Sequence, residues 1–264
     1  MKFVASVFQL ALTLMLFHGG PARAQGLAGS NVADAKPGDL RVIATAAIRE
    51  PLDALLARAR QVAGHPIVVE YGSARGNLKN KILGGQDFEV ALLLPDVNEE
   101  LLKQDKILPE SPEIARVNVG IGLRGDAPDL DVSTPAALKN AMLKARSIKY
   151  APTGAAIMTV QKVLSTLGIG DAIKDSSKER AAVALGPHEY ELNLYPLSEI
   201  IPNKAMKNLG PVMPDLQVPV IISAVIGKHA NDEKAARTLV SFLEGPAIDA
   251  ALAANGMMKG VAAR

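Results

Sequence analysis

The chain contains no cysteine and no tryptophan, and aromatic residues make up only 3% of its 264 positions. The absence of cysteine excludes disulfide bonds, thiolate catalysis and cysteine-ligated metals. Stability must therefore come from the apolar core alone, which a hydrophobic content of 48% makes feasible. A nucleic-acid partner would require stacking rings and a basic face, and the rings at least are scarce.

The N-terminal segment contains a long apolar stretch. Val4–Phe17 has three polar residues, follows the positive charge of Lys2, and precedes the helix-breaking Gly19–Pro21. Ala22–Ala24 then supplies the small-x-small pattern that signal peptidase accepts. The stretch is shorter than the roughly 20 residues needed to cross a bilayer, which disfavours the alternative of a membrane anchor. We expect residues 1–24 to be a cleaved signal peptide, with the mature chain starting at Gln25 and exported to the periplasm.

Removal of this segment also changes the charge. It contains Lys2 and Arg23 but no acid, so 27 of the 29 basic residues remain against 27 acidic ones. The mature protein is then formally neutral and lacks the basic face that nucleic acids require. We expect no nucleic-acid partner.

Several enzyme classes lack their motifs in this sequence. His65, His188 and His229 fall in predicted turns, far apart and without metal-ligand spacing. There is no P-loop, no dinucleotide fingerprint and no G-x-S-x-G elbow. We expect neither a metal nor a cofactor.

Short β-branched runs alternate with segments of helical apolar spacing, which predicts the α/β class. Strands are expected at residues 40–44, 67–71, 88–94, 117–123, 147–150, 192–195 and 218–226, with helices between and after them. This order predicts two doubly wound lobes joined by crossing strands. We expect a Gly/Ala/Asn-rich flexible leader over residues 25–39, a first lobe from residues 40–114 plus 228–264, and a second lobe from residues 115–227.

Five stretches carry a resemblance to a known family: LRVIATAAIREPLDAL at residues 40–55, VVEYGSARGNLKNKI at 68–82, ARVNVGIGLRG at 115–125, PHEYELNLYPLSEIIP at 187–202 and EKAARTLVSFLEGPAIDAALAANGM at 233–257. In this order and spacing the chain is similar to the molybdate-binding-protein-like family of bacterial solute-binding proteins. The resemblance implies a type II periplasmic-binding-protein fold whose ligand cleft between the lobes closes on an oxyanion or small carboxylate. It also implies a monomer that delivers its ligand to an ABC-type permease.

The family holds its anion in loops after strands, where backbone N–H groups, hydroxyls and helix dipoles favour negative charge. Carried over by position, the ligand-binding residues are Thr45, Ala46, Ala47, Arg49, Gly72, Ser73, Arg75, Thr153, Gly154 and Tyr195. Ser73, Thr45 and Thr153 have a plainer interpretation as helix N-caps. Ser198 and Glu199 are predicted to begin or cap a local helix.

The loops depart from the family pattern. Molybdate binders generally offer a serine where this chain has Ala46 and Ala47, and the second loop contains the charged Arg75. Fewer hydroxyls and an added guanidinium favour a carboxylate, which arginine holds in bidentate fashion. A tricarboxylate is therefore preferred to molybdate as the expected ligand, although both oxyanions and carboxylates stay open.

A second function from another class remains open. The family is known to include a periplasmic aconitate isomerase, whose chemistry needs cations for the carboxylates and a general base. Arg49, Arg75 and Lys79 are candidate cations, whereas no base is evident; Tyr195, Lys149 and Glu191 are the candidates. We expect binding for transport rather than catalysis.

Overall fold

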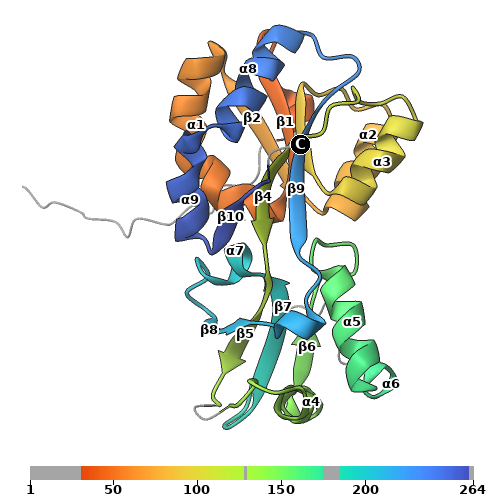
Figure 1. Ribbon diagram of the computed structural model, residues 1–264, viewed down its shortest axis with the longest axis vertical. Helices are drawn as coiled ribbons and strands as arrows, with labels where there is room; N and C mark the ends of the chain where they lie inside the picture. The colour runs from red at the N-terminus through yellow and green to blue at the C-terminus, as the bar shows by residue number, and fades with distance from the viewer. Residues whose placement is uncertain (1–30, 128–129, 175–184, 262–264) are drawn as a thin grey trace, which may run out of the picture.

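The computed structural model describes residues 31–127, 130–174 and 185–261. They form two α/β lobes, one above the other in Figure 1. The first lobe, the upper one, contains a six-stranded sheet in the order β10-β4-β9-β3-β1-β2. The second lobe contains a four-stranded sheet in the order β6-β7-β5-β8. The predicted α/β class with two lobes joined by crossing strands is confirmed.

The six-stranded sheet is mixed. Its strands are β1 (Leu40–Thr45), β2 (Ile67–Gly72), β3 (Val90–Leu93), β4 (Glu113–Val117), β9 (Val220–Ile226) and β10 (Met257–Lys259). β1 pairs in parallel with β2 and β3, because a helical crossover follows each of the first two strands. β9 and β10 enter antiparallel to their neighbours.

Helices cover both faces of this sheet. They are α1 (Arg49–Ala63), α2 (Lys79–Leu83), α3 (Pro95–Lys103), α8 (Glu233–Glu244) and α9 (Asp249–Ala254), with the short turns η1 (Val32–Asp34), η2 (Ala46–Ile48), η5 (Pro246–Ile248) and the π-helical turn η3 (Ala74–Leu78). In Figure 1, α1, α8 and α9 lie on one side of the sheet, and α2 and α3 on the other. The ends have local causes: Gly64 stops α1 at a φ of 72°, and the Asp232 side chain caps α8 by accepting from the Ala235 N–H.

The second lobe is built from one part of the chain. Its strands are β5 (Val119–Gly125), β6 (Ser147–Lys149), β7 (Tyr190–Pro196) and β8 (Lys207–Pro211), and its helices are α4 (Pro135–Lys144), α5 (Ile157–Leu167), α6 (Gly170–Ile173) and α7 (Leu197–Ile200), followed by the turn η4 (Pro214–Leu216). β5 pairs antiparallel with β7, whereas β6 pairs with β7 in parallel. None of the helices in these described ranges is long and apolar enough to cross a bilayer.

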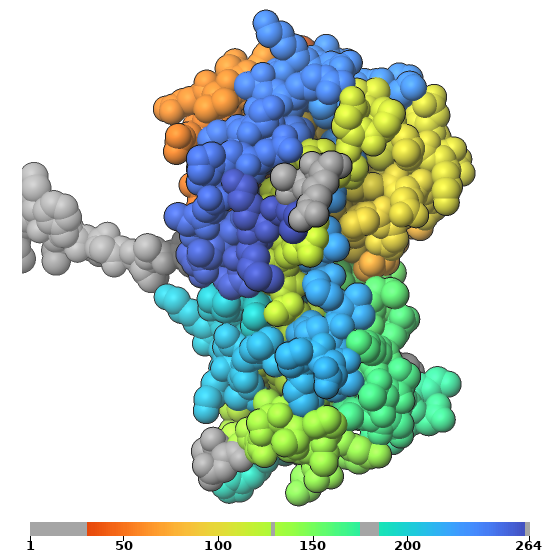
Figure 2. Space-filling model, viewed as in Figure 1, coloured from red at the N-terminus to blue at the C-terminus, as the bar shows by residue number. Residues whose placement is uncertain are grey.

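The chain passes between the sheets in two places. β4 ends at Val117 and β5 begins at Val119, so Asn118 alone separates strands of different sheets. The return path runs from η4 into β9, and Figure 2 shows the two lobes in contact around these crossings. The sequence predicts lobe boundaries after residues 114 and 227. From the strand pairing we propose boundaries at Asn118 and just before Val220.

The segment before β1 packs against the first lobe. Val32 is 1% exposed, and its N–H donates to the Glu70 carboxylate at 3.2 Å. Asn31 caps η1 by accepting from the Ala33 N–H. The predicted flexible leader is therefore wrong for residues 31–39, because one valine finds a buried site within a polar and glycine-rich segment. The predicted signal peptide lies outside the described residues.

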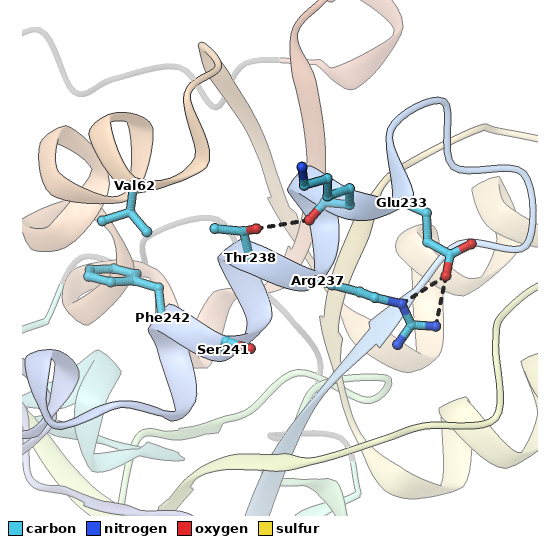
Figure 3. Close-up of a pocket in the computed structure, with 7 residues that line it drawn as sticks. Val62, Glu233, Arg237, Thr238, Ser241 and Phe242 are labelled. Carbon is cyan, nitrogen blue, oxygen red and sulfur yellow. Dashed lines mark hydrogen bonds and ion pairs between the residues drawn. The ribbon is translucent and has the colours of Figure 1, made fainter.

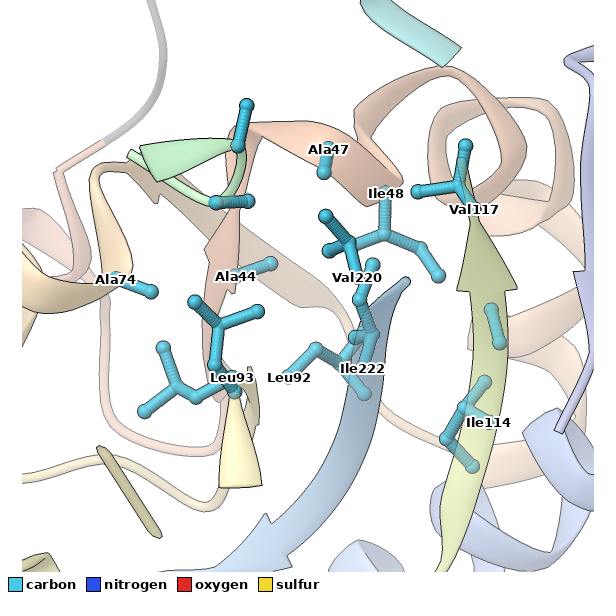
Figure 4. Close-up of a cluster of buried hydrophobic side chains, with 14 of the residues drawn as sticks. Ala44, Ala47, Ile48, Ala74, Leu92, Leu93, Ile114, Val117, Val220 and Ile222 are labelled. Carbon is cyan, nitrogen blue, oxygen red and sulfur yellow. The ribbon is translucent and has the colours of Figure 1, made fainter. Parts of the chain in front are cut away.

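Aliphatic side chains from several strands fill the core of the first lobe (Figure 4). Ala44 of β1, Leu92 of β3 and Ile222 of β9 all have no exposed surface. Residues Val90–Leu93 are buried on both faces, as expected for a central strand covered by helices. Burial of each large aliphatic side chain contributes about 1.5–3 kcal/mol, so this core holds the strand ends in place for the loops that follow.

Candidate functional site

The loops after β1 and β2 are neighbours at the edge of the sheet that faces the second lobe. Thr45 and Gly72, the last residues of these strands, are paired in the sheet register. Thr45 is 2% exposed, and its side chain makes no capping bond to η2. The carboxyl ends of parallel strands commonly line ligand sites in α/β proteins. The geometry therefore brings together the first two of the predicted loops.

Ser73 joins this edge to the second lobe. Its hydroxyl donates toward the backbone oxygen of Thr153 at 2.5 Å and lies 2.8 Å from the Thr153 hydroxyl. The Ser73 N–H donates to Asn77 Oδ1 at 2.8 Å, which fixes the loop. Neither hydroxyl caps a helix: η3 receives no side-chain bond from Ser73, and the residue before α5 is Ala156. The interpretation of Thr153 as a helix N-cap is thus wrong, because residues 152–154 form turns before α5.

Gly76 leaves room for this contact. A Cβ atom at this position would lie 2.6 Å from Thr153 Oγ1 and 3.1 Å from Ser73 Oγ. Real Cβ atoms essentially never approach another atom that closely, so a larger residue would push the two lobes apart. The glycine of the second loop is required here for close approach between lobes.

Arg75 also spans the two lobes, but it already has a carboxylate. Its Nε and Nη2 groups donate to Asp96 Oδ2 and Oδ1 at 2.6 and 3.0 Å, and its Nη1 group donates to the Gly154 backbone oxygen at 3.1 Å. Asp96 belongs to α3, a helix that the sequence did not predict. The bidentate grip that was expected for a ligand is therefore made within the first lobe.

Arg49 lies at the start of α1 and stacks on an aromatic ring. Its guanidinium carbon is 4.3 Å from the centre of the Tyr71 ring. The Tyr71 hydroxyl donates to Asp53 Oδ1 at 2.6 Å. Burial, followed by this hydrogen bond, raises the pKa of Tyr71 well above its ordinary value, so the phenol stays neutral. A neutral, anchored ring holds the Arg49 cation at the lobe interface.

α7 brings the second lobe onto the first loop. The Ser198 hydroxyl donates to the Ala47 backbone oxygen at 2.6 Å, and Ser198 is 2% exposed. The predicted local helix exists, but neither Ser198 nor Glu199 caps it, since α7 has no side-chain capping bond. Burial raises the pKa of the neighbouring Glu199 to about 7, and the charge of Arg49 opposes that rise. Ser198 and Glu199 are thus interface residues that sequence reasoning assigned to a local role.

Three further residues predicted for ligand binding or proton transfer are Tyr195, Lys79 and Glu191. Tyr195 lies near the end of β7, opposite Gly120 of β5. Lys79 is paired with Glu100 at 2.9 Å, and Glu191 is paired with Arg124 at 3.0 Å.

Glu191 is unsuited to act as a base. Burial alone would raise its pKa, but hydrogen bonds from Arg124 and Ser147 hold the pKa below its ordinary value. A base must take up a proton, and this carboxylate is held ionised by its partners.

A separate pocket of about 760 Å³ lies on the outer surface of the first lobe, between α1 and α8 (Figure 3). Val62 and Phe242 form its apolar side. Arg237 is held by Glu233 at 2.8 Å, and the Thr238 hydroxyl donates to a backbone oxygen one helical turn earlier. None of these residues belongs to the loops at the lobe interface.

Two α/β lobes on crossing strands, with hydroxyls, backbone groups and arginines meeting where the lobes touch, define a two-lobed binding protein. Residues 40–258 match the family described as bacterial extracellular solute-binding protein. The chain belongs to this family.

Relatives of known name agree with this assignment. The chain is 28% identical over 240 residues to the molybdate-binding protein ModA of Azotobacter vinelandii, which covers 87% of this chain and 93% of that protein. The solved structure of the A. vinelandii periplasmic molybdate-binding protein has a TM-score of 0.63 and 21% identity, covering 85% of this chain and 100% of the other. The tungstate-binding protein TupA of Desulfovibrio alaskensis has a TM-score of 0.58 and 13% identity, covering 85% and 99%. These matches confirm the predicted family resemblance and the periplasmic-binding-protein fold.

Proposed function

We propose that this protein is a periplasmic solute-binding protein that closes its two lobes on a small anion, a carboxylate or an oxyanion. The observation that carries the proposal is the direct contact of Ser73 with Thr153 across the lobe interface. Hydroxyls and backbone N–H groups at strand ends donate to an anion without titrating, and Arg49 adds a positive charge beside them. Thr45 and Gly72, two of the positions that the family resemblance marks as ligand-binding, are paired at this edge of the first lobe, which supports the proposal.

Closure in this proposal is selected by the ligand. Thr45 and Ser73 contribute from the first lobe, and Thr153, Gly154 and Tyr195 from the second. A ligand that contacts both lobes binds the closed arrangement more tightly than the open one, and so shifts the population toward it. The short connection at Asn118 is suited to act as a hinge, because a few residues at element ends absorb such motions.

The identity of the anion rests on two opposing observations. Relatives named for molybdate and tungstate favour an oxyanion. The absence of hydroxyls at Ala46 and Ala47 favours a carboxylate, but the pairing of Arg75 with Asp96 removes the other reason for that preference. We also propose, from the family resemblance, that the protein is a monomer and delivers its ligand to an ABC-type permease.

The test is a thermal-shift screen of the mature protein against molybdate, tungstate, sulfate, phosphate, citrate, and cis- and trans-aconitate, with chloride at matched ionic strength as the control. A ligand at about a hundred times its Kd stabilises the folded protein by about 2.7 kcal/mol. We expect a rise in Tm with at least one anion and none with chloride. No rise with any of these anions, confirmed by calorimetric titration, would contradict the proposal.

A second candidate is an isomerase of aconitate type that uses the same interface. The residue that favours it is Glu199, which lies beside the contact of Ser198 with Ala47 between the lobes. Burial raises its pKa to about 7, which suits a group that takes a proton from carbon and returns it. Incubation of the protein with cis-aconitate, followed by proton NMR, should show trans-aconitate if this candidate is correct. Binding of aconitate without interconversion would reject the isomerase and support a binding protein for transport.

A further inference from the structure

We infer that the ligand is an anion that also carries a hydrogen-bond donor, an O–H or N–H group, and that Arg49 and Glu199 recognise these two features together. This inference rests on the proposed function and specifies its substrate class. Suitable ligands are 2-hydroxy acids, amino acids or hydrogen phosphate, in contrast to sulfate, molybdate or a plain dicarboxylate.

The two charged residues come from different lobes and lie next to a contact between the lobes. Arg49 begins α1 directly after η2, and Glu199 lies in α7. The bond from Ser198 to the Ala47 backbone oxygen at 2.6 Å places α7 against η2. Each charged residue is therefore one or two positions away from a residue in direct contact across the interface. Arg49 is also the charged group that acts on Glu199 electrostatically.

These opposite charges influence each other electrostatically but are not paired in the described part of the chain. Within residues 31–127, 130–174 and 185–261, neither side chain makes an ion pair or a hydrogen bond, although both are half-buried. Arg49 instead stacks on Tyr71, which Asp53 anchors. Partly desolvated charges without hydrogen-bond or ion-pair partners are unfavourable, so a site of this kind is completed by a ligand that satisfies both.

The chemistry of the pair sets the ligand class. Arg49 has only donors and binds the anionic group, whereas an ionised carboxylate has only acceptors and repels a second anion. An O–H or N–H group on the ligand turns that repulsion into a hydrogen bond to Glu199. An anion without such a group needs Glu199 to be protonated, so its binding takes up a proton and improves as the pH falls below 7.

Other titratable groups near α7 do not replace this pair. The strands packed against α7 carry Arg124, Tyr190, Glu191, Tyr195 and Lys207. Arg49 and Glu50 begin α1, directly after η2, which also packs against α7. The Tyr190 hydroxyl donates to the Ala141 backbone oxygen. Arg124 and Glu191 are paired with each other, and Lys207 and Glu50 are exposed. Tyr195 makes an interaction of its own. Arg49 is thus the cation that acts on Glu199.

The test compares ligands that differ by one donor, by calorimetric titration at pH 8: malate with succinate, citrate with tricarballylate, and hydrogen phosphate with sulfate. In at least one pair we expect the donor-bearing member to bind at least tenfold more tightly to the natural protein. In E199Q the ratio should fall toward one, through tighter binding of the donor-free member. E50Q removes the same charge at an exposed neighbouring position and should leave the ratio unchanged.

The outcomes separate the inference from the proposed function. If no anion binds, the proposed function fails. If anions bind but both members of every pair bind equally, or if E199Q leaves the ratios as they are, the inference is wrong and the proposed function stands. R49Q provides a second variant: it should weaken both members of a pair alike, and a loss confined to one member would contradict the assigned roles.

Discussion

The hydroxyl oxygen of Ser73 lies 2.8 Å from that of Thr153, although 80 residues and a change of sheet separate them. Replacing Ser73 with alanine removes the contacts of this hydroxyl across the interface. A hydrogen bond contributes about 1 kcal/mol net, so closure becomes less favourable and ligand affinity should fall about fivefold. Calorimetric titration measures this loss. S165A, which removes an exposed hydroxyl bonded within its own helix, is the control and should bind as the natural protein does.

Asp96 decides how Arg75 acts. If Arg75 serves closure through its bond to Gly154, D96N misorients the guanidinium and should weaken ligand binding by roughly two- to fivefold. If Arg75 grips the ligand directly, D96N frees it and should tighten binding. E100Q breaks the neighbouring Lys79–Glu100 pair, for which no bond to the described part of the second lobe is found, and serves as the matched control. Tighter binding by D96N would overturn the assignment of Arg75 to closure.

A side chain at Gly76 should disturb the contact between the two lobes. In G76A the new methyl group meets Thr153 Oγ1 at 2.6 Å, so the lobes cannot approach to the distance described here. We expect a loss of ligand affinity of at least tenfold, with each lobe still folded by circular dichroism. G170A, at a glycine with open space around it, should bind normally. Full affinity in G76A would show that this contact is not needed for binding.

Glu199 should make stability depend on pH near neutrality. Its folded-state pKa of about 7 lies above the ordinary 4.5, so the folded protein holds a proton that the unfolded chain releases. The stability linked to this proton is complete below pH 4.5 and is lost as the pH rises through 7. E199Q should therefore be more stable than the natural protein at pH 8, by roughly 1–3 kcal/mol. Urea unfolding at pH 5 and pH 8 measures the difference; an equal difference at both values would contradict it.

Glu89 should govern stability in acid. Its side chain is 1% exposed and accepts from Arg41 Nη2 at 2.7 Å and from the Asn231 N–H at 3.2 Å. Burial would raise its pKa, but these bonds hold it below the ordinary 4.5. Stability from this group is thus kept above pH 4.5 and lost as the pH falls through the lowered pKa. E89Q leaves Arg41 without its carboxylate and should cost about 3–5 kcal/mol in urea unfolding at pH 7. E99Q, at an exposed carboxylate, should cost little.

The strand–helix–strand order of the first lobe was predictable, because its strands are short buried runs and α1 has clear helical spacing. Other elements lack such signals. β8 is an exposed strand that contains Gly210 and Pro211, and β10 has three residues, of which Met258 is 55% exposed. A strand of this kind forms because its neighbour is there to pair with, which no local pattern records.

The same limit applies to the site. The resemblance to a family predicts the loops of Thr45, Ser73 and Thr153 as ligand-binding loops. It does not reveal that Arg75 is paired with Asp96, or that Ser198 reaches Ala47 across 151 residues. Such pairings depend on tertiary contacts between elements distant along the chain. Charge type alone therefore assigned Arg75 to the ligand.

The position of β10 at the edge of the first sheet has a consequence for folding. β10 pairs with β4, and β9 lies between β4 and β3, so this sheet cannot be completed until Met257–Lys259 is present. The second sheet uses one continuous stretch from Val119 to Pro211. Long-range pairing slows folding because loop closure precedes any gain from contacts. We therefore expect the second lobe to acquire its fold first during synthesis or refolding, with the first lobe assembling around the two strands that lead out of it.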